Sequence, residues 1–175
     1  PQLVNLALSS GSSANIQKQA AAMSREMDTA LTWSDIAWVR RHWKGPVIVK
    51  GLLAREDASR ALHAGVDGVV VSNHGGRQLD GAPSPLEQLP RIVELVQDKM
   101  RVFVDGGVRR GSDIAKALAL GADAVLLGRA PLYGLAARGP RGVNEVLSIL
   151  RVELEITLRL LGVTRAADLN NECIA

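Results

Sequence analysis

The sequence predicts a parallel α/β fold that forms the C-terminal half (strands 5–8) of a TIM-type (β/α)8 barrel. Three observations predict it: short apolar runs alternate with helical segments, one strand–helix unit occurs twice, and each run ends in a polar residue or glycine. A complete barrel of this kind needs roughly 250 residues. The chain has 175 residues and four such runs, so we expect a second half-barrel to complete the fold.

The four apolar runs are typical of strands that are buried on both faces of a sheet. They are PVIVK (46–50), GVVVS (68–72), RVFVD (101–105) and AVLLG (124–128). Helical spacing predicts helices at 32–43, 55–65, 85–99, 112–121 and 143–161. Thr32 is the expected N-cap of the first helix, and Gly65 and Gly121 are expected just after the ends of their helices.

The repeat sets the order of these elements. Five residues recur at a constant offset of 56: Asp57, Ala61, Leu62, Gly65 and Asp67 match Asp113, Ala117, Leu118, Gly121 and Asp123. A unit used twice, with polar groups at the carboxyl end of each strand, favours a barrel. We assign 1–31 to a loop and lead-in helix after strand 4, and 32–175 to the half-barrel.

Composition excludes several classes of protein. Hydrophobic residues make up 47% and charged residues 22% of the chain, and the formal net charge is only +3. These values do not fit a disordered tail, and they give no reason to expect a nucleic-acid partner. The single cysteine, Cys173, excludes a disulfide within the chain, and no apolar run reaches the roughly 18 residues of a membrane span. The opening at Pro1 has no secretion signal and does not look like a native N-terminus, so we expect a cytoplasmic protein.

Chemistry-bearing residues follow the first two runs. Lys50 is expected at the mouth of the barrel, as a fixed positive charge beside an anionic group rather than a lysine that only extends into solvent. SNHGGRQLD (72–80) is the densest polar cluster of the chain. Its His74 can exchange a proton near neutral pH, and Arg77 offers a planar fork that suits a carboxylate. His74 alone would be explained more simply as a hydrogen-bonded loop histidine.

Two glycine turns follow the last two runs. The third run leads into DGGVRRGS (105–112) and the fourth into GRAP (128–131). Paired glycines before a helix N-terminus make a cradle of backbone N–H groups for an anion, and the arginines add positive charge. Phosphate sites in barrels commonly use the loops after strands 7 and 8. The two turns together therefore predict a phosphate site.

These motifs resemble a known family. SNHGGRQ (72–78) is similar to the active-site signature of the FMN-dependent 2-hydroxy-acid oxidases and dehydrogenases, which include glycolate oxidase, lactate oxidase, flavocytochrome b2 and mandelate dehydrogenase. VKG (49–51), DGGVRRG (105–111) and LGR (127–129) match in the same order, and the resemblance covers roughly residues 13–165. The opening segment is similar to that of the mandelate dehydrogenases. That similarity favours mandelate or an aryl relative as substrate and leaves lactate and glycolate open.

The resemblance implies oxidation of an (S)-2-hydroxy acid to the 2-oxo acid, with a hydride passing to flavin N5 of FMN. It implies that His74 takes the proton, that Arg77 binds the substrate carboxylate, and that Lys50 lies near flavin N1 and its C2 carbonyl. The cofactor-binding residues that it implies are Lys50, Ser72, Asp105, Gly106, Gly107, Val108, Arg109, Gly128 and Arg129. No metal site is expected.

The resemblance also implies partners. The family's aspartate partner of the catalytic histidine and its substrate-contacting tyrosines belong to the N-terminal half, so we expect activity only when that half is present. These barrels commonly form tetramers. LVNLAL (3–8), within the loop at 1–10, suggests a membrane contact, which would place the protein at the periphery of the inner membrane. The electron acceptor stays open among oxygen, a quinone and a cytochrome.

Other interpretations remain at this point. Type 2 isopentenyl diphosphate isomerase and inosine monophosphate dehydrogenase are barrels with similar phosphate turns, but neither is expected to carry SNHGGRQ. The non-enzymatic alternative is an inactive half-barrel kept for its structure. The intact pair of His74 and Arg77 argues against it, because a scaffold needs neither residue.

Overall fold

The computed structural model describes residues 25 and 28–174. The chain divides into two compact units, Pro1–Ile36 and Ala37–Ala175. Helix α3 (Trp33–His42) begins at the predicted place, because the N–H and Oγ1 of Thr32 both donate to Asp35 Oδ2, at 2.7 and 2.9 Å. The loop predicted at the start of the chain, with its LVNLAL segment, lies outside the described residues.

Four parallel strands form the sheet, as predicted. They lie in sequence order as β1 (Ile48–Leu52), β2 (Gly68–Val71), β3 (Arg101–Asp105) and β4 (Ala124–Leu126). The register pairs Val69 with Val49 on one side and with Val102 on the other. Every residue of β2 is buried, whereas the two outer strands are partly exposed. This is the half-barrel that the apolar runs predicted, with one neighbour for each outer strand.

The position of Lys50 differs from the prediction. We expected it at the end of a strand over 46–50, but β1 begins and ends two residues later, and Lys50 pairs with Val70 inside it. The register shifts between Lys50 and Leu52, where Gly51 has a φ of +98°. A glycine tolerates this conformation, so the strand continues through a bulge instead of ending.

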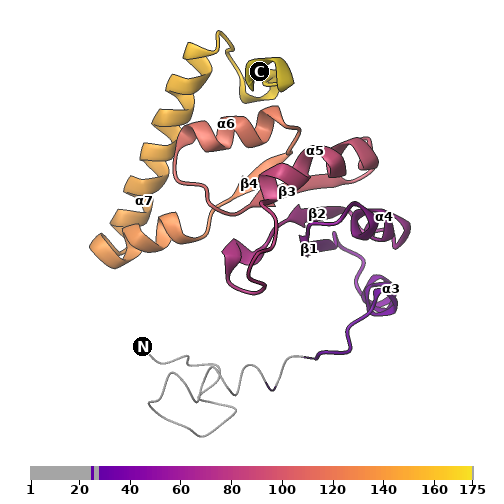
Figure 1. Ribbon diagram of the computed structural model, residues 1–175. Helices are drawn as coiled ribbons and strands as arrows, with labels where there is room; N and C mark the ends of the chain where they lie inside the picture. Colours follow the sequence, from indigo (N-terminus) through magenta and orange to yellow (C-terminus); the bar gives the residue numbers. More distant parts are fainter. Residues whose placement is uncertain (1–24, 26–27, 175) are drawn as a thin grey trace, which may run out of the picture. The chain divides into compact units, whose positions relative to one another are not determined.

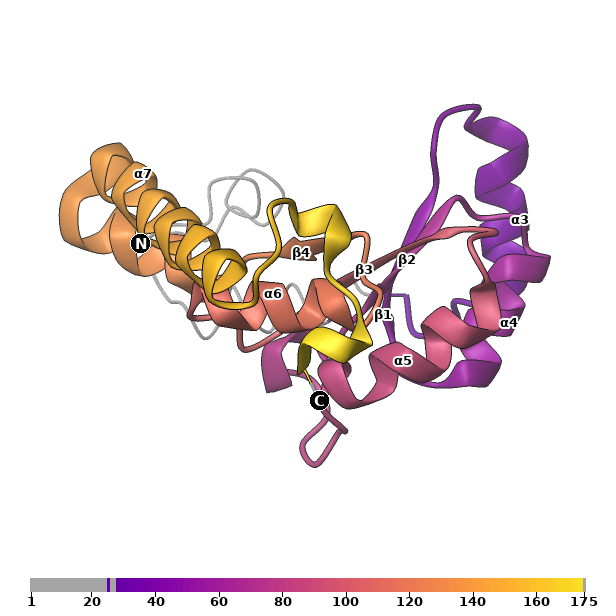
Figure 2. The ribbon, with the colours of Figure 1, turned by 90° about the horizontal axis from the view of Figure 1, so that it is seen from above.

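Helices α4 (Arg55–His63), α5 (Pro85–Val96) and α6 (Gly111–Ala119) lie along one face of the sheet (Figure 2). The largest fully buried side chains include Leu89 and Ile92 of α5 and Val69 and Val102 of the central strands. Burying each such side chain contributes about 1.5–3 kcal/mol. The core therefore lies between the central strands and α5.

Helix α7 (Arg129–Leu160) is much longer than the predicted 143–161 (Figure 1). Its backbone leaves helical geometry at Arg138 and Gly139, so α7 consists of two segments. The segments cross where Gly134 meets Gly142, so closely that a Cβ on either residue would overlap the other's carbonyl group. None of the helices in the described part of the chain is both long and apolar enough to cross a membrane.

The C-terminal segment packs on α6. Two 3₁₀ turns, η2 (Ala166–Asp168) and η3 (Asn171–Ile174), follow α7. Leu169 and Ile174 cover Ala115 and Ala119 of α6 in a small apolar cluster. This segment therefore shields the face of α6 that the sheet does not cover.

The repeated aspartates have equivalent bonds. Asp67 precedes β2, and its Oδ2 accepts the N–H of Val47 at 2.7 Å; Asp123 precedes β4, and its Oδ2 accepts the N–H of Val102 at 2.7 Å. An arginine pairs with each carboxylate, Arg40 at 3.1 Å and Arg101 at 2.6 Å. In both copies of the predicted repeat, an aspartate before one strand thus accepts a backbone N–H at the start of the neighbouring strand; we call these two contacts the fastening bonds.

Candidate functional site

Three predicted residues meet at the carboxyl end of the sheet. Lys50 Nζ lies 2.8 Å from Asp105 Oδ2 and donates a hydrogen bond of 2.9 Å to Ser72 Oγ. Lys50 belongs to β1, Ser72 follows β2 and Asp105 ends β3. Ser72 is fully buried, whereas the Lys50 side chain keeps 41% of its exposure. The three strands therefore present one fixed positive charge at the mouth of the half-barrel.

Asp105 holds an unsatisfied oxygen. Its Oδ2 pairs with Lys50, but its Oδ1 is buried and has no hydrogen-bond partner among the described residues. A buried carboxylate oxygen without a donor is unfavourable by about 1–3 kcal/mol. The site therefore offers an acceptor to a hydroxyl group of a ligand.

His74 is held from two sides. Ser72 Oγ accepts the His74 N–H at 3.0 Å, and the backbone of His74 has a φ of +55°, which is uncommon for a residue other than glycine. A Cβ built on Gly51 would lie 2.5 Å from His74 Nε2, so the imidazole lies directly against the bulge of β1. Ser72 therefore holds the backbone of His74, and Gly51 bounds its imidazole.

The turn that carries His74 continues through Gly75 and Gly76, with φ values of +70° and +73°, as the 3₁₀ turn η1 (His74–Gly76). Asn73 Oδ1 accepts the Gly76 N–H at 3.1 Å and closes the turn. Arg77 follows immediately and is exposed. The structure thus places His74 and Arg77 at the two ends of one turn. The closing role of Asn73 was not predicted, although an Asx residue before two glycines is a recognisable turn signal.

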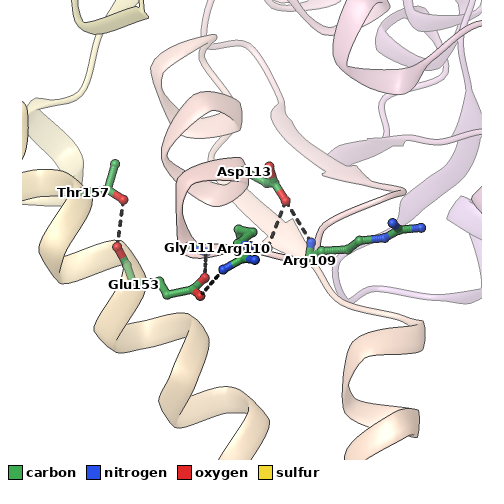
Figure 3. Close-up of polar contacts among 6 residues, drawn as sticks. All are labelled: Arg109, Arg110, Gly111, Asp113, Glu153 and Thr157. Carbon is green, nitrogen blue, oxygen red and sulfur yellow. Dashed lines mark hydrogen bonds and ion pairs between the residues drawn. The ribbon is translucent and has the colours of Figure 1, made fainter.

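The first glycine turn differs from the predicted anion cradle. Asp113 Oδ2 accepts the N–H groups of Arg109 and Arg110, both at 2.9 Å, and Glu153 Oε2 accepts the Gly111 N–H at 2.8 Å (Figure 3). Protein carboxylates therefore accept three of the N–H groups at the start of α6, those of Arg109, Arg110 and Gly111, and these three are not available to an anion. A cradle made by the rest of the turn stays a prediction.

What remains for a ligand is the inner part of that turn. Gly106 and Gly107 have φ values of +110° and +73° and are exposed, and Val108 is half-buried. The side chain of Arg109 extends away from Asp113 and Glu153 (Figure 3). The loop after β3 therefore has two parts. Residues 106–108 are open to a ligand, whereas the backbone of residues 109–111 is bound by carboxylates of the same chain.

The second glycine turn leads into the N-terminus of α7, which is not capped by a side chain of the described residues. Gly128 is the N-cap of this helix. Arg129 Nη2 donates to the Gly75 carbonyl at 3.2 Å, so the start of α7 is joined to the turn of His74. A helix N-terminus with an adjacent arginine favours an anion. The described residues contain no group of three or more side chains that could hold a metal ion.

The model of the FMN-dependent dehydrogenase family matches residues 3–175. The chain belongs to this family. The resemblance found in the four motifs is confirmed, and the alternative barrels with similar phosphate turns are set aside.

Individual relatives agree with this assignment. The (S)-mandelate dehydrogenase of Pseudomonas putida is 54% identical over 162 residues, which are 93% of this chain and 40% of that protein. The L-lactate dehydrogenase of Caulobacter vibrioides is 45% identical over 174 residues, 99% of this chain and 45% of that protein. Among solved structures, the monotopic membrane protein (S)-mandelate dehydrogenase matches with a TM-score of 0.89 at 51% identity, over 98% of this chain and 45% of that one. The chain thus spans less than half the length of these relatives.

Proposed function

We propose that this chain, together with an N-terminal half-barrel, oxidises an (S)-2-hydroxy acid to the 2-oxo acid with FMN as cofactor. The observation that carries the proposal is the joined cluster of Lys50, Ser72 and Asp105 at the carboxyl ends of three strands, with His74 bonded to it. Family membership and the names of the relatives support it.

The residues present fit FMN. The unsatisfied Oδ1 of Asp105 suits a hydroxyl donor such as those of the ribityl chain, and Lys50 and Ser72 suit the polar edge of the flavin ring. An open glycine turn and a free helix N-terminus, each with an arginine, suit the phosphate. The residues that would hold this end are Gly106, Gly107, Val108, Arg109, Gly128 and Arg129. When bound, FMN supplies an acceptor for the hydride that leaves the substrate.

The chain's own residues supply binding and proton transfer. Arg77 binds the substrate carboxylate through its planar guanidinium and so orients the α-carbon. His74 takes one proton while the hydrogen on the α-carbon leaves with two electrons, so the alcohol becomes a ketone. The positive charge of Lys50 would stabilise the negative charge that a bound flavin gains on reduction, which would lower the barrier electrostatically.

The proposal extends to substrate class and location. An aryl 2-hydroxy acid such as mandelate is the favoured substrate and L-lactate the second, since relatives named for both are 54% and 45% identical to this chain. We also propose attachment to the surface of the inner membrane through residues 1–10, and assembly as a tetramer. The monotopic relative supports the attachment.

An anaerobic visible spectrum of the complete enzyme tests this function. The expected result is a flavin band that bleaches when (S)-mandelate is added, and more slowly with L-lactate. A band that neither acid bleaches would contradict the substrate class. A colourless protein that does not take up FMN would contradict the cofactor and the main proposal with it.

A further inference from the structure

The proposed function leaves part of the loop after β3 without a role. Arg110, Gly111 and Asp113 bind protein groups rather than a ligand, and Glu153 lies opposite them on α7 (Figure 3). Glu153 is 42 residues away from Gly111 along the chain, so its position there is a product of the fold.

Glu153 makes two bonds with its single carboxylate. Oε2 accepts the Gly111 N–H at 2.8 Å, and Oε1 accepts from Arg110 Nη1 at 3.2 Å. The Glu153 side chain is 28% exposed and that of Arg110 is 73% exposed. The bond to a backbone N–H fixes the path of the loop, while the ion pair holds the side chain of Arg110 on the α7 side.

The side chains of Arg109 and Arg110 therefore point in different directions and have different partners. The guanidinium of Arg110 is bound to Glu153, whereas the side chain of Arg109 extends in the other direction (Figure 3). Asp113 Oδ2 accepts both backbone N–H groups and keeps the two arginines in this arrangement. Adjacent arginines in the sequence thus become one structural residue and one residue available to an anion.

Glycine contacts make the connection rigid. Gly111 is buried, and a Cβ there would overlap the backbone of Glu153 and Leu154, so α6 begins directly against α7. The crossing of Gly134 and Gly142 joins the second segment of α7 to the first, which begins at Arg129. One continuous set of contacts therefore links the turn after β3 to the turn after β4.

We propose that Glu153 is a positioning residue for the cofactor phosphate, through a latch formed by Glu153, Arg110 and Gly111. The latch holds the turn of Arg109 at a fixed place relative to the N-terminus of α7, so that both turns meet one phosphate group without rearrangement. This inference rests on the proposed function, because it assumes that the two turns bind FMN.

The test compares FMN with riboflavin, which lacks the phosphate, in flavin-fluorescence titrations of the complete apo-enzyme. Glu153→Gln keeps the size of the side chain and removes its charge. We expect it to weaken FMN binding roughly 3- to 30-fold, the range found for residues that act through a contact network, and to leave riboflavin binding unchanged. Glu155→Gln is the matched control, because within the described part of the chain Glu155 pairs only with the exposed Arg151 of the same helix.

Each outcome decides the matter. Equal FMN affinity in Glu153→Gln and the wild type would overturn the latch. An equal loss of FMN and riboflavin affinity would show a general effect on the fold and would overturn the positioning role. If Glu153→Gln does not fold, Arg110→Gln breaks the same latch at a largely exposed residue and should weaken FMN binding selectively. A wild-type enzyme that does not bind FMN would instead refute the proposed function.

Discussion

At the scale of single residues, the site depends on contacts that hold His74 rather than on His74 alone. Ser72 Oγ accepts both from the Lys50 ammonium and from the backbone N–H of His74, so one buried hydroxyl joins the charged side chain of the site to the backbone that carries its proposed base. Gly51 bounds the imidazole on the other side. Placement of the reacting groups is a large part of enzymatic rate enhancement, so these supports are expected to matter as much as the base.

Gly51→Ala is expected to lower kcat of the complete enzyme by on the order of 10²-fold, because the new methyl group would displace the imidazole. The Cβ would lie 2.5 Å from His74 Nε2. FMN affinity, measured by titration, should change little.

Gly65→Ala is the control for Gly51→Ala. Gly65 also has a positive φ, +70°, but a Cβ there would meet no atom of the described residues within 4 Å. It should destabilise the fold by about 1 kcal/mol and leave kcat unchanged. Equal kcat in the wild type and Gly51→Ala would refute the contact with His74.

At the scale of elements, the paired aspartates predict a measurable stability difference. Asp67→Ala and Asp123→Ala each leave the N–H of Val47 or Val102 without its acceptor, and these valines are 8% and 2% exposed. Each change should reduce the free energy of unfolding by about 1–3 kcal/mol in urea titrations. The two losses should add, because the carboxylates of the two aspartates bind different groups.

Asp57→Ala provides the comparison for the two aspartates. Among the residues that the structure describes, Asp57 pairs only with Arg60, whose side chain is 61% exposed, one turn along α4. This change should reduce stability by less than about 0.5 kcal/mol. A loss from Asp57→Ala as large as that from Asp123→Ala would show that the fastening bonds have no special weight.

Element η2 should loosen in acid. Arg165 donates two hydrogen bonds to Asp168, at 2.6 and 3.1 Å. This hydrogen bonding is the main reason that the pKa of Asp168 lies below its usual 3.8. A lowered pKa in the folded state adds stability that is fully present above about pH 4 and is lost as the pH falls through the lowered value.

Amide exchange of the Leu169 N–H, expressed as a protection factor, measures this loosening. Protection should be constant between about pH 6 and about pH 4.8, which is roughly one unit above the usual pKa of 3.8, and should fall below that pKa. The Val70 amide of the buried strand serves as reference. Asp168→Asn should abolish the pH dependence, and an unchanged dependence in that variant would assign it to another group.

The sequence predicted elements better than it predicted their ends. Local periodicity sufficed for the four strands, but the continuation of β1 through Gly51 depends on a bulge that pairs with β2. The first segment of α7 was not predicted, because Gly139 and Pro140 read as a loop signal, whereas the crossing of Gly134 and Gly142 needs small residues there. The carboxylates at the start of α6 include Glu153, whose contact is non-local and has no signal in the sequence.

At the scale of the whole molecule, the chain exposes apolar side chains that are expected to be covered by other protein. Ile149, Val152, Ile156 and Leu160 recur at helical spacing on α7, and their exposed fractions are 56, 52, 48 and 83%. Ile48 on the outer strand β1 is 50% exposed. Surfaces of this kind mark contacts with other protein. The N-terminal half-barrel of the proposed enzyme is the partner that we expect to cover them.

The 175-residue chain alone is therefore expected to associate with itself and to show no turnover, while adding the N-terminal half should restore both a defined size and activity. Size-exclusion chromatography and turnover of (S)-mandelate in the presence of FMN measure the two effects. Tight FMN binding with turnover by the lone chain would contradict the need for the second half.

The two fastening aspartates lie at the amino ends of the strands, and the residues proposed for chemistry lie at the carboxyl ends. The residues that stabilise the sheet and the residues proposed for chemistry therefore lie at opposite ends of its strands. Each strand–helix unit carries one of these aspartates, whereas its first strand carries Lys50 in one copy and Asp105 in the other. Such units are interchangeable parts, and new chemistry can be introduced by replacing loops on one rim while the other rim keeps the barrel assembled.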